Sequence, residues 1–342
     1  MGGLLAELGK RIAERWFTLL VLPGLLYVAA LAAAHALGHA HPFDARRVTD
    51  RLDTVNAGTA SASGLALLGA YLLAAATAGL AAQSLGSLVE RLWLATDWTG
   101  WPSPLRRLAA HRTRRRHRRW TDAMTAYHRA REDAAAAHAH ARLTPNPPAP
   151  TPADPAPSSP LPSADPPAPY DPLPSARDLA YRKALRIAAE PPARPTWMGD
   201  RLDDITVRLD RDLGLDLATV WPYLWLIAPD TTRTEIVAAR ETLTRATTLA
   251  GWGLLYLAVG ALWWPGLPIA AAVLVTAWRR ARTACDMYAL LVEATARLQT
   301  ADLAHRLGLE HTGPVTHETG TAMTDLLRTR PPQLGPTPRG RR

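Results

Sequence analysis

The sequence predicts an all-α, polytopic membrane protein with two transmembrane helical hairpins, hence four spans, plus cytoplasmic helices and a disordered proline-rich linker. Three observations support this. Residues 246–278 contain no charged side chain over 33 positions, residues 16–37 contain none over 22, and 14 of the 32 residues from 144 to 175 are proline. A helix needs about 20 apolar residues to cross the hydrocarbon core of a bilayer. Both uncharged stretches meet that length.

Composition narrows the class of protein further. Of the 39 basic residues, all but Lys10 and Lys183 are arginine, a bias typical of a GC-rich bacterial genome. The only cysteine is Cys285, which excludes an intrachain disulfide and a cysteine-based zinc site. We therefore expect a protein of the bacterial cell membrane.

The first hairpin covers residues 16–89, with spans at about 16–37 and 64–88, and follows an amphipathic cytoplasmic lead at 1–15. A cleaved signal peptide is the alternative for the first span, although its apolar stretch exceeds the usual length of about 7–15 residues. The second span carries small or polar residues on one narrow face, which favours close helix packing. These are Ala75, Gly79, Gln83 and Gly86. Oligomerisation or the lining of a pore is the alternative role for this face.

Residues 90–143 are predicted to be a cytoplasmic basic helix, because eleven arginines and only three carboxylates lie between 104 and 143. A basic helix close to a membrane span is typical of contact with anionic lipid headgroups. The residues assigned to this contact are Arg112, Arg114, Arg115, Arg116, Arg118 and Arg119. The alternatives are a protein partner, pairing with an aspartate-bearing helix of the same chain, or nucleic acid, which is disfavoured because no nucleic-acid-binding motif accompanies the cluster.

The middle of the chain separates into a linker and a helical segment. Residues 144–175 are too rich in proline and too poor in apolar side chains to fold, which predicts a disordered spacer. Residues 176–245 then form a cytoplasmic helical segment. Within it, 197–213 carries one apolar stripe at helical spacing, and Asp216 is a predicted N-cap of the apolar run 217–227.

The second hairpin covers residues 246–285, with spans at about 246–264 and 266–285. The sequence Trp263-Trp264-Pro265-Gly266 predicts a turn near its middle, since proline and glycine end helices. Basic residues flank the hairpins at their outer ends, whereas the connections carry no excess of positive charge, so both termini are predicted to be cytoplasmic. The last span is short, and a re-entrant hairpin is the alternative. Residues 286–342 form a cytoplasmic helix and a disordered tail.

No catalytic, cofactor-binding or metal-binding motif is present in the sequence. We therefore expect a non-enzymatic, membrane-anchored scaffold or partner-binding protein whose partners are anionic membrane lipids, an unknown cytoplasmic protein and a possible second copy of the chain. An oligomeric ion channel or pore with a cytoplasmic helical domain is the alternative function.

Three short motifs resemble a group of uncharacterised multi-pass membrane proteins of high-GC Gram-positive bacteria. They are Pro195-Thr196-Trp197-Met198-Gly199-Asp200-Arg201-Leu202, then Leu215-Asp216-Leu217 with Trp221-Pro222, and Trp263-Trp264-Pro265. The resemblance covers about residues 177–309 and implies a membrane location without a known activity. The order of hairpins and cytoplasmic helices is also similar to the layout of bestrophin-type anion channels, in topology only.

Overall fold

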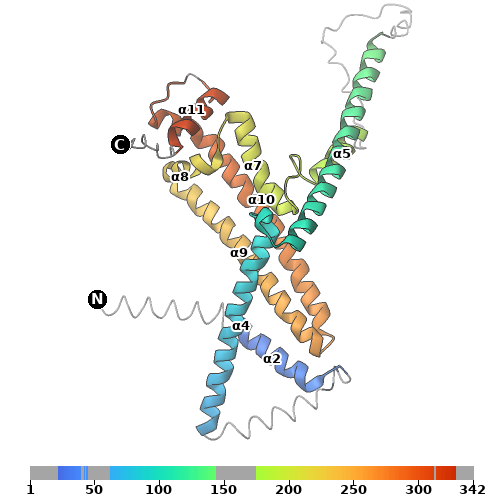
Figure 1. Cartoon of the computed structure of the whole chain (residues 1–342), viewed down its shortest axis with the longest axis vertical. Coiled ribbons are helices and arrows are strands. Elements are labelled where there is room, and N and C mark those ends of the chain that lie inside the picture. Colours follow the sequence, from blue (N-terminus) through green and yellow to red (C-terminus); the bar gives the residue numbers. More distant parts are fainter. Residues whose placement is uncertain are drawn as a thin grey trace, which may run out of the picture. The chain divides into compact units, whose positions relative to one another are not determined.

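The computed structural model describes residues 22–39, 42, 44, 62–143, 175–311 and 313–328, in which every regular element is a helix (Figure 1). The predicted lead at 1–15, the start of the first span and linker residues 144–174 lie outside the described residues. The chain divides into two compact units, one formed by residues 1–96 with 201–342 and the other by 97–200.

In the larger unit, α2 (Leu22–Leu37) packs against α4 (Ala62–Leu94), and α4 crosses α9 (Asp230–Leu262). The α2 contact is close, because a Cβ atom added at Gly24 would lie 2.1 Å from the backbone oxygen of Ala75. The helix of the predicted second span continues to Leu94, beyond the expected end at residue 88. It continues because Glu90 is satisfied within the protein, by the guanidinium of Arg240 on α9.

The second hairpin is formed by α9 and α10 (Gly266–Arg306), which are antiparallel and joined by the predicted turn at Trp263, Trp264 and Pro265. The indole Nε1 of Trp263 donates a hydrogen bond of 2.9 Å to the backbone oxygen of Pro42, which follows α2. The connection after α2 and the turn between α9 and α10 therefore lie side by side. The helices α9 and α10 also run unbroken past residues 245 and 285, where the sequence analysis placed segment boundaries.

The opposite end of this unit is built from α7 (Trp197–Leu213), α8 (Leu217–Ile227) and α11 (His317–Leu327), which pack against α10. Large apolar side chains form its core: Ile205, Leu209, Leu215, Val220, Leu224, Val292, Leu303 and Met323. The apolar stripe of α7 and the N-cap at Asp216 agree with the sequence prediction. Helix α11 lies in a stretch for which no helix was predicted.

Three ion pairs join α7 to α10, and the paired residues are 85 positions apart in each case. They are Arg201 with Asp286, Arg208 with Glu293, and Asp212 with Arg297. Because the separation is constant, the two helices run parallel and keep one register along this contact.

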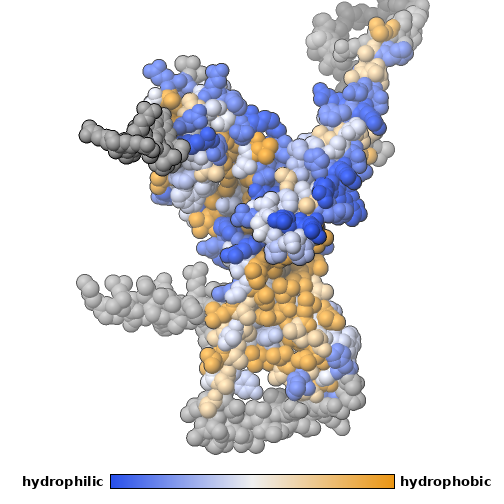
Figure 2. Space-filling view, in the orientation of Figure 1, coloured by the Kyte–Doolittle hydropathy of each residue, from blue (hydrophilic) through white to orange (hydrophobic). Residues whose placement is uncertain are grey.

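The other part of the unit, formed by α2, α4 and the adjoining ends of α9 and α10, has small residues inside and large residues outside. This is the reverse of the core around α7, α8 and α11. Figure 2 shows the resulting orange surface. It is called here the apolar band and is formed by α2, residues 66–88 of α4, 246–262 of α9 and 266–278 of α10. Buried in it are Ala34, Ala75, Ala78, Ala82, Ala250, Gly251, Ala270 and Ala277. Exposed on it are Leu22, Leu26, Tyr71, Leu72, Leu73, Leu80, Leu88, Leu257, Leu267, Ile269 and Val275. This pattern is typical of helices that pack against one another within lipid.

Among the described residues, one helical segment is both long and apolar enough to cross a membrane, namely 68–94 of α4. The described part of α2 has 16 residues, and the charge-free parts of α9 and α10 have 17 and 13. At about 1.5 Å per residue these measure about 24, 26 and 20 Å. The four predicted spans thus include one segment of full length and three shorter ones.

The smaller unit contains η2 (Trp98–Gly100), α5 (Ser103–Leu143) and α6 (Ala176–Leu185), with a loop to residue 196 and the first turn of α7. Pro104 occupies the first turn of α5, where a missing N–H group costs no helical hydrogen bond. Helix α5 spans 41 residues and carries the predicted arginine cluster.

Candidate functional site

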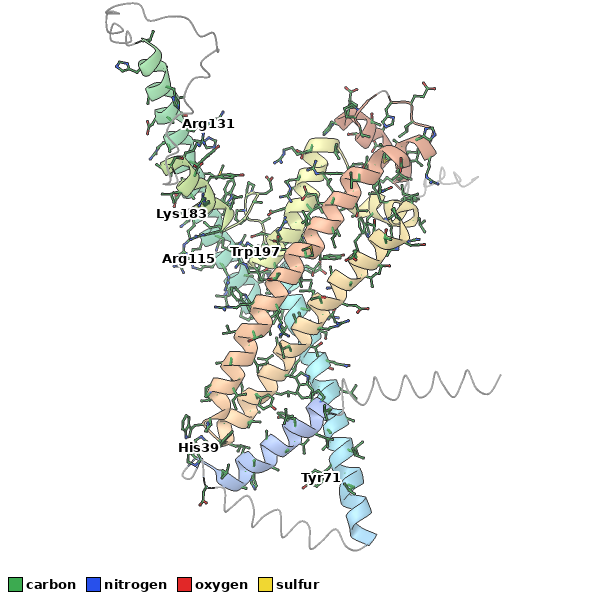
Figure 3. The ribbon with its side chains drawn as sticks, turned by 180° about the vertical axis from the view of Figure 1, so that it is seen from behind. His39, Tyr71, Arg115, Arg131, Lys183 and Trp197 are labelled. Carbon is green, nitrogen blue, oxygen red and sulfur yellow. The ribbon has the colours of Figure 1, made fainter. Side chains whose placement is uncertain are left out.

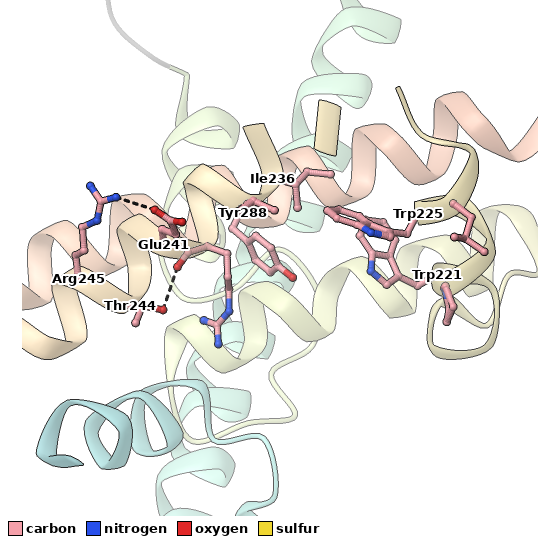
Figure 4. A pocket seen from close by; sticks show the side chains of 11 residues that line it. Trp221, Trp225, Ile236, Glu241, Thr244, Arg245 and Tyr288 are labelled. Atoms are coloured by element: carbon pink, nitrogen blue, oxygen red, sulfur yellow. Dashed lines mark hydrogen bonds and ion pairs between the residues drawn. The ribbon is translucent and has the colours of Figure 1, made fainter. Parts of the chain in front are cut away.

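A groove lined by aromatic side chains lies in the larger unit, between α8, α9 and the side chain of Tyr288 on α10 (Figure 4). Its volume is about 850 Å³. The lining residues, together called the aromatic groove, are Trp221, Pro222, Trp225, Leu226, Ile236, Val237, Arg240, Glu241, Thr244, Arg245 and Tyr288. Such a concave apolar surface with a few polar groups at one side is typical of a binding site.

The sequence of α8 explains why two indole rings line this groove. Val220 and Leu224 are fully buried in the core of the unit, so Trp221 and Trp225, each one position later, lie on the adjoining face. Their ring centroids are 6.0 Å apart, at an interplanar angle of 43°. Leu226 is 72% exposed at the edge. The helix contains no charged residue, and the face outside the core is therefore apolar as well.

Charged groups occupy the other end of the groove, nearest the apolar band. Glu241 accepts a hydrogen bond of 2.7 Å from the guanidinium of Arg245, and Arg240 pairs with Glu90 of α4. The hydroxyl of Thr244 donates to the backbone oxygen of Arg240 at 3.2 Å. An occupant of matching chemistry is therefore apolar along most of its length and polar at one end.

Among the residues that line the groove, polar reactive groups are few. Its only carboxylate, Glu241, is already paired with an arginine, and no serine, cysteine or histidine lines the walls. Across the described residues, no group of three or more metal-ligating side chains comes together. The walls of the groove are thus mainly apolar.

Five of the six arginines assigned to lipid contact project from α5 into solvent. They are Arg112, Arg114, Arg115, Arg118 and Arg119, and none forms an ion pair with a described carboxylate (Figure 3 labels Arg115). Four of them, with His111, surround a shallow depression of about 350 Å³. This surface carries positive charge that the described part of the chain does not neutralise.

Arg116 differs from the other five and corrects the prediction for this residue. Its guanidinium points into the smaller unit, where it pairs with Asp200 at 2.6 Å and donates to the backbone oxygen of Ile187 at 2.7 Å. The side chain is only 17% exposed. Arg116 therefore joins α5 to the loop after α6 and to the first turn of α7, and its guanidinium is engaged within the protein.

Its partner Asp200, at 1% exposure, lies on the aspartate-bearing helix that the sequence analysis gave as an alternative partner of the basic helix, and for Arg116 this alternative holds. Its other carboxylate oxygen accepts hydrogen bonds from the backbone N–H groups of Ala193 at 3.0 Å and Arg194 at 2.6 Å. Burial raises the pKa of this carboxyl, and the N–H of Arg194 and the guanidinium of Arg116 oppose part of the rise. The indole of Trp120 adds a hydrogen bond of 3.1 Å to the oxygen of Ala188 in the same loop.

The predicted packing face of α4 is only partly the face that packs. Ala75, Gly79 and Gly86 are buried, and a Cβ atom at Gly86 would lie 2.8 Å from the Cα atom of Thr248 on α9. Gln83 is exposed instead, because the buried row passes through Ala82 and turns its neighbour outward. The small residues of α4 are thus occupied by α2 and α9 of the same chain.

Comparison with known protein families, with curated proteins and with solved structures finds no match to this chain. What the site does therefore has to be argued from its own residues.

Proposed function

We propose that this chain is a four-span protein of the bacterial cell membrane that acts, without catalysis, as an anchored scaffold for a cytoplasmic protein partner. We also propose kinship with the multi-pass proteins of high-GC Gram-positive bacteria that its motifs resemble. Both termini are assigned to the cytoplasm. The exposed arginines of α5 contribute contact with anionic headgroups.

The membrane assignment is supported by the apolar band, in which leucines face outward while alanines and glycines face inward. Burying one leucine side chain is worth about 1.5–3 kcal/mol, so many exposed leucines in one continuous band indicate an apolar surrounding. The bond between Trp263 and Pro42 supports the four crossings, since it joins the two connections at one end of the band. The short spans of α9 and α10 are compatible with local bilayer thinning.

The observation that carries the scaffold role is the aromatic groove. Ile236 lies ten residues from Ala246, where the apolar band begins on α9, which is about 15 Å along the helix. The headgroup layer of one leaflet is only about 5–8 Å thick. The indoles beside Ile236 therefore lie beyond the lipid and are open to a protein. An apolar helix or peptide with one polar end is the occupant we propose.

Site-specific photo-crosslinking tests this role. A photoreactive phenylalanine analogue at Leu226, at the edge of the groove, should give one discrete adduct in living cells. The same analogue at Leu298, which is 75% exposed on α10 outside the groove, should give none. Trp225→Ala should abolish the adduct at Leu226. Equal adducts at both positions, or an adduct that survives Trp225→Ala, would refute the groove as the docking site.

The mass of the detergent-solubilised particle separates the scaffold from the alternative of a channel. A pore needs a closed oligomer, for which we expect four or more chains, whereas a scaffold requires only a monomer or dimer. Because the small residues of α4 pack against α2 and α9, they are not free to line a pore within one chain. If light scattering found a closed oligomer, a channel would become the favoured function. Conductance measurements in liposomes would then test it.

A further inference from the structure

A second groove, distinct in chemistry from the first, lies between α9 and α10 at the edge of the apolar band. Its volume is about 800 Å³. The residues that line this arginine groove are Ala239, Thr242, Arg245, Ala246 and Leu249 of α9 and Arg279, Arg280, Thr283, Ala284 and Met287 of α10. Three guanidinium groups thus surround a surface that is otherwise formed by small and apolar side chains.

The charge of the arginine groove is largely uncompensated. No carboxylate lines it, and neither Arg279 nor Arg280 forms an ion pair with a described residue. Arg245 pairs with Glu241 one turn away, and that contact is exposed to solvent on both sides. Arg282, which follows on α10, lies over the ring of Trp278 at 5.6 Å and does not line the groove.

The position of the groove matches the boundary between lipid tails and headgroups. Arg245 is the last charged residue before the uncharged run of α9, and Arg279 is the first after that of α10. Leu249 lies one turn inside the band, while Ala239 and Met287 lie on the outer side of the arginines. The groove is therefore apolar at the end that enters the band and cationic at the boundary.

We propose that the arginine groove binds one anionic phospholipid, whose phosphate is held by Arg245, Arg279 and Arg280 and whose acyl chain follows Leu249. The inference rests on the proposed membrane location and adds a defined lipid site on the second hairpin, separate from the arginines of α5. Arginine forks bind phosphate oxygens in bidentate geometry. A phospholipid is favoured over a soluble phosphate because its acyl chain contacts the apolar end of the groove, whereas a soluble anion makes no contact there.

Native mass spectrometry of the full chain in a neutral detergent tests the proposal. Delipidated protein is titrated with phosphatidylglycerol, and the occupancy of the first bound lipid is compared between wild type and Arg279→Gln with Arg280→Gln. We expect half occupancy of the double variant to require about thirtyfold more lipid than that of wild type, since the two arginines together contribute about 2 kcal/mol. Arg306→Gln is the matched control, being the same change on the same helix about 40 Å away.

Three other outcomes would each refute a different part of the proposal. Equal lipid binding by wild type and double variant would refute the arginine groove. Displacement of the lipid by equal concentrations of glycerol phosphate would show that the site takes a soluble anion. Recovery of wild-type protein in the soluble fraction after alkaline washing of membranes would refute the membrane location itself. Wild-type circular dichroism of the double variant excludes misfolding as the cause of lost binding.

Discussion

Asp200 is a carboxylate that water hardly reaches, held by two backbone N–H groups and one guanidinium. Its burial raises its pKa, so the charged form depends on these three donors. Arg116 therefore acts within the fold, although its five neighbours of the same type face solvent. The sequence shows a run of arginines but gives no sign of which one turns inward, because the partner is 84 residues away.

Removal of Arg116 is predicted to loosen the loop that carries Ala193 and Arg194. Arg116→Gln leaves a buried carboxylate without its counter-ion, which costs about 3 kcal/mol and corresponds to roughly a hundredfold faster opening. Hydrogen exchange measured by mass spectrometry on peptides covering 186–200 reports this opening. Arg118→Gln, an exposed change on the same helix, should leave exchange within a few-fold of wild type. Equal exchange in both variants would contradict this role of the ion pair between Arg116 and Asp200.

Glu293 gives a prediction for the dependence of stability on pH. Its hydrogen bond from Arg208, followed by charge interaction with Arg208 and contacts with Arg297, lowers the pKa of the carboxyl below 4.5. A lowered pKa in the folded state contributes stability that is complete above the unfolded value and is lost as the pH falls through the folded value. We expect the melting temperature of wild type to fall below about pH 4.5 more steeply than that of Glu293→Gln.

At pH 7, wild type should be more stable than Glu293→Gln. Loss of a partly buried charged hydrogen bond lowers the free energy of unfolding by about 1–3 kcal/mol. Thermal unfolding in a neutral detergent measures this loss. Glu235→Gln, an exposed glutamate on α9, serves as control and should change little at either pH. Parallel pH profiles for wild type and Glu293→Gln would rule out this pair as the source of acid sensitivity.

At the scale of elements, the crossing of α4 and α9 decides how the apolar band is packed. A Cβ atom at Gly251 would lie 2.0 Å from the backbone oxygen of Ala82, so the two backbones touch there. Within lipid, such contact replaces the burial of large side chains as the source of helix association. The close approach is possible only because a glycine stands at this position of α9.

Gly251→Ala is therefore predicted to force the two helices apart. Overpacking of this kind costs about 1–3 kcal/mol, and the added methyl group here meets backbone that cannot rotate away. Gly69→Ala on α4 is the matched control, because an added Cβ atom there has no neighbour within 4 Å. Thermal unfolding in detergent should show a lower midpoint for Gly251→Ala alone. A midpoint equal to that of wild type would mean that α4 and α9 do not touch at Gly251 in solution.

The elements predicted from the sequence are those with a strong local signal. The apolar stripe of α7, the cap at Asp216 and the turn before Gly266 each depend on residues close together in the chain. Helix α11 escaped prediction because it is short and its contacts are remote: Met323 enters the core, and Gly320 touches the backbone of Leu213. The aromatic groove escaped prediction for the same reason, since Tyr288 lies 67 residues beyond Trp221 and 63 residues beyond Trp225.

At the scale of the whole molecule, the proposed topology predicts which positions are reachable from outside the cell. The single cysteine, Cys285, is buried, so the unmodified chain should give little background with a thiol reagent. His39→Cys and Trp264→Cys should react with a membrane-impermeant maleimide in intact cells. His39 follows α2 and is labelled in Figure 3, and Trp264 lies in the turn between α9 and α10, next to the Trp263 indole that contacts Pro42. Arg306→Cys should react only after permeabilisation. Labelling of Arg306→Cys in intact cells would reverse or refute the topology.

The continuity of α9 and α10 has a mechanical consequence. Helix α10 extends for 41 residues, about 60 Å, from the apolar band to the core beneath α11, and α7 is held to it in register by three ion pairs. Such a pair of long helices behaves as a stiff lever. Under the proposed membrane topology, a change in bilayer thickness that tilts the hairpin would displace the aromatic groove farther than the membrane segment, so the lipid surroundings would affect the reach of the proposed docking site.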